Sequence, residues 1–103
     1  MSDRISHFRQ KIKENPANSL FKFSLAQLLH ESGDNEEAAI LFEQCLSEKP
    51  NWMMSALFLG KVNIALNNKE QAVKYLQVTK DLAIEQNHDD PLQEAIELLS
   101  ELQ

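Results

Sequence analysis

The chain has few of the residues that interrupt or cross-link a fold: of its 103 residues, two are glycine, three are proline and one is cysteine. A single cysteine cannot form a disulfide within the chain. The scarcity of glycine and the lack of any sustained two-residue alternation of polar and apolar side chains argue against a β-sheet. Because 43% of the residues are hydrophobic, the chain can build one core. We therefore expect a single all-α domain.

Long apolar runs are also missing. The longest, from Met53 to Leu59, contains Ser55 and is far too short to span a bilayer. The chain starts with the polar residues Met-Ser-Asp-Arg, and no apolar signal-peptide segment follows. We expect a cytoplasmic protein that does not enter a membrane.

Basic residues are outnumbered, ten against sixteen acidic ones, for a net charge of −6. This acidity argues against binding to nucleic acid, which needs a basic surface. The charge is uneven: residues 1–22 hold five basic and two acidic residues (+3), and the remainder holds five and fourteen (−9). Such polarity suits head-to-tail attraction between copies or a partner of opposite polarity. The plainer interpretation is that the charges lie on solvated helix faces.

The stretch from residue 25 to residue 50 predicts two antiparallel helices. Its apolar residues recur three and four apart, as on one helical face: Leu25, Leu28 and Leu29, then Ala38, Leu41, Phe42, Cys45 and Leu46. Gly33 suits the left-handed position that ends the first helix. Asp34 suits the N-cap of the second, with Glu37 reaching back to it. Pro50 ends that helix.

Shifting the chain so that Leu25 falls on Leu59 superimposes this hairpin on the segment that follows. The other superimposed pairs also keep their size: Ala26 with Gly60, Ala38 with Ala72, Phe42 with Leu76, and Cys45 with Thr79. This 34-residue period, with its small and large alternation and a closing proline, resembles the tetratricopeptide repeat. Phe8 and Pro16 precede Phe42 and Pro50 by the same interval, so the first helix resembles the second half of an earlier repeat.

The resemblance implies an α-solenoid of about six helices in one domain, residues 1–103. Its parts are a half-repeat helix (3–16), two repeats (19–50 and 53–87) and a capping helix (90–102). Asparagines or other polar residues suit the caps of these helices: Ser2, Asn18, Asn51, Asn68 and Asp90, with Pro91 at the first position of the last helix.

Five residues depart from the family pattern. Lys22 and Ala56 stand where the family often has a tryptophan. Asn63 replaces a large apolar residue, and Asn67 replaces the turn glycine, although asparagine tolerates that backbone conformation. Ile84 replaces the closing proline, so the fifth helix is expected to continue towards Asn87. In the last helix, five residues are expected to face the second repeat, namely Leu92, Ala95, Ile96, Leu99 and Leu102, while Glu94, Glu97 and Glu101 face water.

The first helix of each repeat lines the concave face in this family. The residues expected there are Leu20, Phe23, Gln27, His30, Met54, Leu57, Phe58, Lys61 and Ile64. They suggest an apolar groove for an amphipathic helix or extended peptide of a protein partner, with Gln27 and Lys61 as polar contacts. Alternatively, the chain's own ends fill the groove, or these side chains belong to the core.

Two local features bear on that groove. Some members of the family grip a partner's C-terminal carboxylate with Lys, Asn and Arg, but Phe23, Gln27 and Phe58 stand where Lys and Asn would be needed. We predict no such clamp. Trp52, followed by two methionines, is either an exposed anchor or, as is more usual after the closing proline, packed across the junction between repeats.

Catalytic patterns are missing. His7, His30 and His88 are isolated, and no metal-binding spacing or glycine-rich phosphate loop is present. Cys45 matches Thr79 in register, which indicates a small buried residue. We predict no catalytic, metal-binding or cofactor-binding residues. The leading hypothesis is a non-catalytic protein–protein interaction module, an adaptor or scaffold. The alternative is a self-association module that forms a homodimer through exposed apolar or charge-polarised faces.

Overall fold

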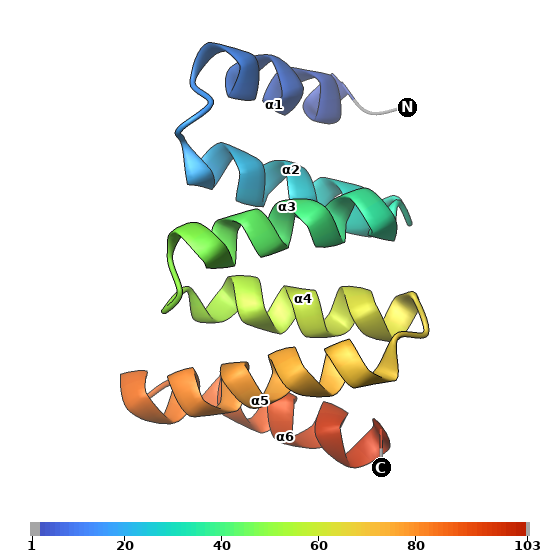
Figure 1. The fold of residues 1–103 in the computed structure, drawn as a ribbon, viewed down its shortest axis with the longest axis vertical. Helices are drawn as coiled ribbons and strands as arrows, with labels where there is room; N and C mark the ends of the chain where they lie inside the picture. The colour runs from blue at the N-terminus through green and yellow to red at the C-terminus, as the bar shows by residue number, and fades with distance from the viewer. Residues whose placement is uncertain (1–2, 103) are drawn as a thin grey trace.

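The computed structural model describes residues 3–102, which form six α-helices and no strand (Figure 1). The helices are α1 (Asp3–Glu14), α2 (Ser19–Glu31), α3 (Asn35–Glu48), α4 (Met53–Ala65), α5 (Lys69–Gln86) and α6 (Asp89–Leu102). They follow one another in chain order from one end of the molecule to the other. The predicted all-α solenoid is confirmed. Ser2, the expected cap of α1, lies outside the described residues.

The stack is curved. The first helices of successive hairpins touch, since α2 contacts α4 and α4 contacts α6. The second helices are further apart: among the described residues, no Cα atoms of α1 and α3, or of α3 and α5, approach within 8 Å. Closer spacing on one side makes that side concave, so α2, α4 and α6 line the inner face.

The 34-residue register predicts the core. The small and large residues that it pairs are all buried: Leu25 and Leu59, Ala26 and Gly60, Ala38 and Ala72, Phe42 and Leu76, Cys45 and Thr79. The fit between helices is close at Gly60, where an added Cβ would lie 2.6 Å from Leu76 Cδ2. Equivalent positions in the two repeats therefore have equivalent environments, which confirms the register.

Two of the predicted helix caps are confirmed, one is confirmed in position only, and the caps predicted for α4 and α6 are wrong. The side chains of Asn18 and Asn68 accept hydrogen bonds from the backbone N–H groups three residues later, at 3.2 and 3.4 Å. Asp34 is the residue before α3, as predicted, but its side chain makes no cap bond. The Glu37 carboxylate, expected to reach back to Asp34, binds Arg9. The residue before α4 is Trp52, not Asn51.

Three of the described residues between helices adopt the left-handed conformation, as expected for Gly33 (φ +86°) and Asn67 (φ +59°). The third, Asn87 (φ +60°), ends α5, which continues past Ile84 as predicted. The expected cap of α6 is wrong: α6 begins at Asp89, so Asp90 and Pro91 lie inside its first turn. A strict repeat of α4 would begin at Asn87, so α6 starts two residues late.

Most of the apolar stripe predicted on α6 faces the stack, including Leu102. Ala95 and Leu99 are buried as expected, and Leu98 packs beside them. Ile96, expected in the same apolar stripe, is 40% exposed. Glu94, expected in water, forms an ion pair with Lys61 of α4. The prediction is therefore wrong for Ile96, whereas the Glu94 side chain remains 42% exposed beside its partner.

Candidate functional site

An aromatic cluster lies where α2, α3 and α4 meet. Phe23 stacks on Trp52 with ring centroids 4.7 Å apart, and its edge faces Phe42 and Phe58 at 5.5 and 5.9 Å. Phe42 and Phe58 stack in parallel at 5.3 Å. Trp52 thus packs across the junction between the repeats, as the second interpretation above predicts. Phe42 is buried, whereas Phe23, Trp52 and Phe58 are each half-buried.

Two more of the predicted site residues surround Phe58. The His30 ring meets it edge-on at 6.2 Å and bonds Asn35 through Nδ1. Lys61 Nζ lies 5.4 Å from the centre of the Phe58 ring and pairs with Glu94 of α6. Glu94 is missing from the sequence-based set. Its pairing with Lys61 depends on how α6 packs beside α4, which local sequence patterns do not show.

The predicted position of Leu57 in the groove is wrong. It is 1% exposed and forms a core cluster with Leu76 and Leu99, so it cannot line a groove in this structure. Ile64 packs against the same cluster. Both residues lie on the side of α4 that α5 and α6 cover.

Leu20 and Met54 are the predicted residues that remain open to solvent, 59% and 36% exposed. They lie one repeat apart, in the first turns of α2 and α4, and so occupy the same place on neighbouring inner helices. We call Leu20, Phe23, Met54 and Phe58 the inner patch. Gln27, on α2, is half-buried.

Three hollows open at other places on the surface. One lies between α1 and α2, one between α1 and α3 beside Leu25, and one between α5 and α6. Their volumes are about 250, 270 and 210 Å³. None of these three includes a residue of the inner patch.

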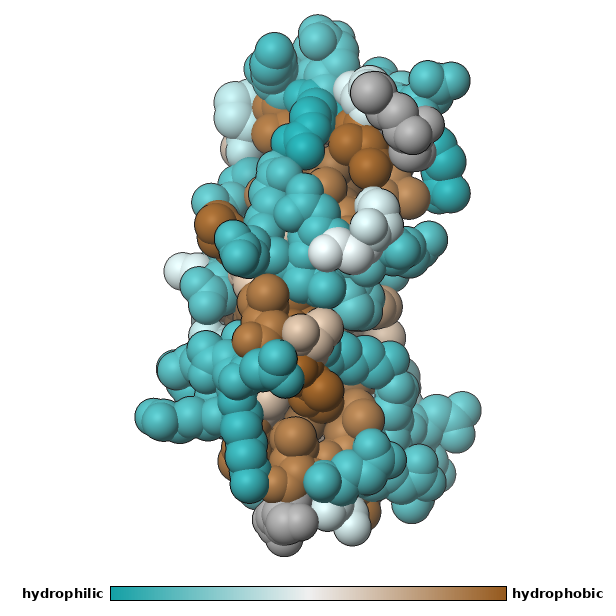
Figure 2. All heavy atoms as spheres, turned by 90° about the vertical axis from the view of Figure 1, so that its right-hand side faces the viewer, coloured by the Kyte–Doolittle hydropathy of each residue, from teal (hydrophilic) through white to brown (hydrophobic). Residues whose placement is uncertain are grey.

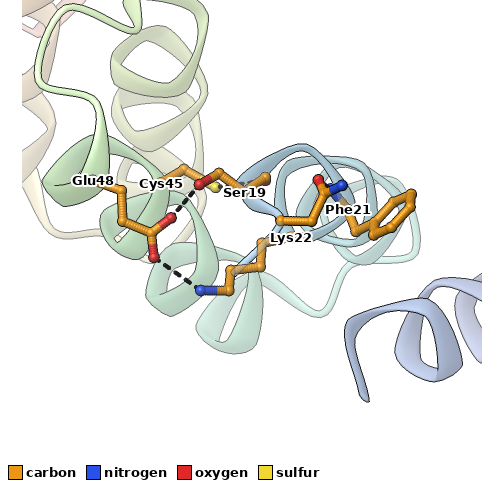
Figure 3. Close-up of polar contacts among 6 residues, drawn as sticks. Ser19, Phe21, Lys22, Cys45 and Glu48 are labelled. Atoms are coloured by element: carbon orange, nitrogen blue, oxygen red, sulfur yellow. Dashed lines mark hydrogen bonds and ion pairs between the residues drawn. The ribbon is translucent and has the colours of Figure 1, made fainter. Parts of the chain in front are cut away.

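A polar network joins the start of α2 to the end of α3 (Figure 3). Glu48 accepts hydrogen bonds from the Ser19 hydroxyl and from Lys22 Nζ, the latter at 2.9 Å. These bonds, that from Ser19 most of all, lower the pKa of the Glu48 carboxyl. The network therefore links α2 to α3.

Cys45 is fully buried beside this network, with Sγ 3.5 Å from the Ser19 carbonyl oxygen. Burial raises the pKa of its thiol to about 11. The thiolate, which is the reactive form, is therefore scarce at neutral pH. The prediction of a small buried residue is confirmed.

Among residues 3–102, no three His, Cys, Asp or Glu side chains are grouped so that they could hold a metal ion. No helix in this range has the length and apolar character needed to cross a membrane.

Comparison with known proteins identifies relatives of the chain. The model of the family described as regulator of microtubule dynamics protein 1-3 matches residues 31–103. No curated protein matches the sequence. Among solved structures, the TPR2B domain of yeast Sti1 in its pHsp70 complex has a TM-score of 0.86 at 17% identity, covering 95% of this chain and 78% of that one.

A tetratricopeptide repeat domain protein from Salinibacter ruber is also similar. Its solution structure has a TM-score of 0.76 at 20% identity, covering 86% of this chain and 90% of that one. Its crystal structure has a TM-score of 0.75 at 20% identity, covering 82% and 96%. These likenesses show that the fold is that of tetratricopeptide repeat domains.

Proposed function

The chain belongs to the regulator of microtubule dynamics protein 1-3 family, and on this premise we propose that it is a non-catalytic protein-interaction module. The proposed ligand is a peptide or amphipathic helix of a protein partner, bound along the concave face. The family description supports a search for that partner among the proteins that act in microtubule dynamics. An adaptor or scaffold role in the cytoplasm belongs to the same proposal.

The inner patch is the observation that carries this proposal. Leu20 and Met54 hold large apolar side chains in water at equivalent places on α2 and α4, beside the half-buried rings of Phe23 and Phe58. Full burial of one such side chain is worth about 1.5–3 kcal/mol. Two exposed apolar side chains on a rigid aromatic base are typical of a surface that accepts the apolar face of a helix.

The charges nearby favour an apolar ligand. Lys61, one of the two predicted polar contacts, is paired with Glu94, so neither charge is available without breaking that pair. Phe23, Gln27 and Phe58 still stand where a carboxylate clamp would need Lys and Asn. We therefore propose recognition through apolar side chains, with Gln27 as the polar contact, and no capture of a terminal carboxylate.

A pair of double variants tests the proposal. Leu20→Glu with Met54→Glu adds two charges to the inner patch. The control, Ile40→Glu with Ile84→Glu, changes two side chains that are 57% and 55% exposed on the second helices α3 and α5. Capture from a lysate and co-sedimentation with polymerised tubulin are measured for both. The inner-patch variant should lose its partner while the control keeps it, with equal helical circular dichroism. Equal binding by the two variants contradicts the proposal.

A further inference from the structure

The inner face changes from apolar to acidic along the stack. Counted from the start of each inner helix, the second, sixth, ninth and thirteenth residues share one side of that helix, because they are three or four apart. These residues are Leu20, Ser24, Gln27 and Glu31 in α2, Met54, Phe58, Lys61 and Ala65 in α4, and Asp90, Glu94, Glu97 and Glu101 in α6. This side therefore carries most of the inner patch on α2 and α4, but only carboxylates on α6. We call the four carboxylates of α6 the acidic stripe.

The acidic stripe lies on the flank of α6 that is turned to α4. Glu94 forms an ion pair with Lys61 of α4, and Lys61 Nζ lies 5.4 Å from the centre of the Phe58 ring. Ile96 lies on the other flank of α6, where it lines the hollow against α5. The stripe is therefore continuous with the inner patch through these contacts.

Most charges of the acidic stripe have no counter-charge. Asp90, Glu97 and Glu101 are exposed, and within residues 3–102 none of the three forms an ion pair. The Gln93 amide that donates to Glu97, at 3.4 Å, is neutral. α6 contains five acidic residues and no basic one. These three carboxylates are thus open to basic side chains of a bound molecule.

One short segment can reach both the inner patch and the acidic stripe. α4 contacts both α2 and α6, and the axes of helices in contact lie about 8–10 Å apart. A helical ligand advances about 5.4 Å per turn. If such a ligand crosses the inner helices, its side chains reach α6 about two turns after those that lie on α4.

Figure 2 shows the side of the stack that lies to the right in Figure 1, where apolar patches are separated by hydrophilic side chains. A ligand with one apolar face would cover those hydrophilic groups, which costs free energy unless each group finds a partner. On the inner face, by contrast, the exposed side chains of Leu20 and Met54 lie on helices that touch. The inner face therefore suits an amphipathic ligand better.

We propose that the ligand of the concave face is a basic amphipathic segment of a protein. Its apolar side chains contact the inner patch, and its Lys or Arg side chains, about two turns further on, pair with the acidic stripe. The inference rests on the proposed function, because the apolar contacts supply most of the affinity. Exposed ion pairs each add little affinity, but they select basic segments over acidic ones, since like charges repel.

A display library of random peptides tests the proposal on the full chain. Peptides of roughly 16 residues extend about 24 Å as a helix, which is enough to cross the inner face. The peptides that the chain retains should combine apolar residues three or four apart with Lys or Arg, and should be depleted in Asp and Glu. Retained peptides that are apolar without a charge bias, or that are acidic, overturn this proposal but leave the proposed function standing. Retention without apolar enrichment overturns both.

Two double variants then locate the basic part of the ligand. Glu97→Lys with Glu101→Lys reverses two charges of the acidic stripe. The control, Asp81→Lys with Glu85→Lys, makes the same change of net charge at two exposed residues of α5 with the same spacing. The affinity of a retained basic peptide is measured by isothermal titration calorimetry in about 0.05 M salt, where screening is weak. It should fall about tenfold or more for the stripe variant and less than about threefold for the control.

The remaining outcomes separate the two proposals. Unchanged affinity in the stripe variant, or an equal loss in the control, overturns the pairing with the acidic stripe. Leu20→Glu with Met54→Glu should abolish binding of the same peptide, and binding that survives this change contradicts the proposed function instead. Helical circular dichroism should be equal for all variants.

Discussion

Arg9 of α1 and Glu37 of α3 form a bidentate ion pair, with Nη1 2.6 Å from Oε2 and Nη2 2.9 Å from Oε1. The pair links two second helices whose backbones do not touch. α1 has no buried residue, so this pair supplements the apolar packing of Ile5, Phe8 and Ile12. Both side chains are well exposed, so the pair contributes at most about 1 kcal/mol.

The first prediction concerns the stability of the fold at acidic pH. The hydrogen bonds from Arg9 lower the pKa of Glu37 in the folded chain from its ordinary value of 4.5. Between the lowered folded-state pKa and pH 4.5, the unfolded chain therefore binds more protons than the folded chain. The contribution of the Arg9–Glu37 pair to stability is full above about pH 4.5. It disappears as the pH falls through the lowered folded-state pKa. Urea unfolding from pH 6 to about pH 3 should show stability falling more steeply for the native chain than for Glu37→Gln. Identical pH profiles would count against the pair.

The second prediction concerns the close contact at Gly60. Alanine normally stabilises a helix interior by about 1 kcal/mol relative to glycine. Here the new methyl group would lie 2.6 and 2.7 Å from Leu76 Cδ2 and Cγ, and Leu76 is fully buried. The overpacking costs about 1–3 kcal/mol, so Gly60→Ala should lower the unfolding free energy in urea. Adding Leu76→Val should recover part of the loss; a more stable Gly60→Ala variant would contradict the contact.

The third prediction concerns Asn63, which is buried and whose side chain donates a hydrogen bond from Nδ2 to the Leu59 carbonyl of its own helix, at 2.8 Å. That carbonyl keeps its backbone bond when the side chain is changed. Leu29 fills the equivalent place in the first repeat. Asn63→Leu should therefore raise stability by about 1 kcal/mol, while Asn63→Ala should lower it by leaving a void. Thermal unfolding followed by circular dichroism compares the two, and a lower midpoint for the leucine variant would refute the equivalence.

The fourth prediction concerns Cys45. With its thiol buried and its pKa raised to about 11, the native chain should resist thiol reagents at pH 8 and react only as it unfolds. Cys45→Thr, which copies Thr79 in the second repeat, should be tolerated because Thr79 bonds its own helix at Tyr75. Cys45→Leu should be destabilising because it overpacks the site. Rapid labelling of the folded protein would contradict this account.

The sequence predicts the fold well because helix spacing and repeat register depend on local patterns. Five size-matched pairs, each one repeat apart, are enough to place the core. The candidate site is harder to predict, because whether a side chain on an inner helix is buried depends on what the next helix covers. Leu57 is buried in the core because α6 packs over it. No residue near Leu57 in the sequence indicates this burial.

The error at α6 concerns one position of its apolar stripe, because Ile96 is exposed while Leu98 packs against the core. Likewise, the Glu37 carboxylate does not reach back to Asp34 but binds Arg9, which lies 28 residues away in sequence. Interactions between distant segments override local preferences at these positions.

The chain contains one tryptophan, and it stacks on Phe23, a member of the inner patch. Its fluorescence therefore originates beside the surface proposed to receive a ligand. Emission wavelength and quenching can follow occupancy there without a dye label.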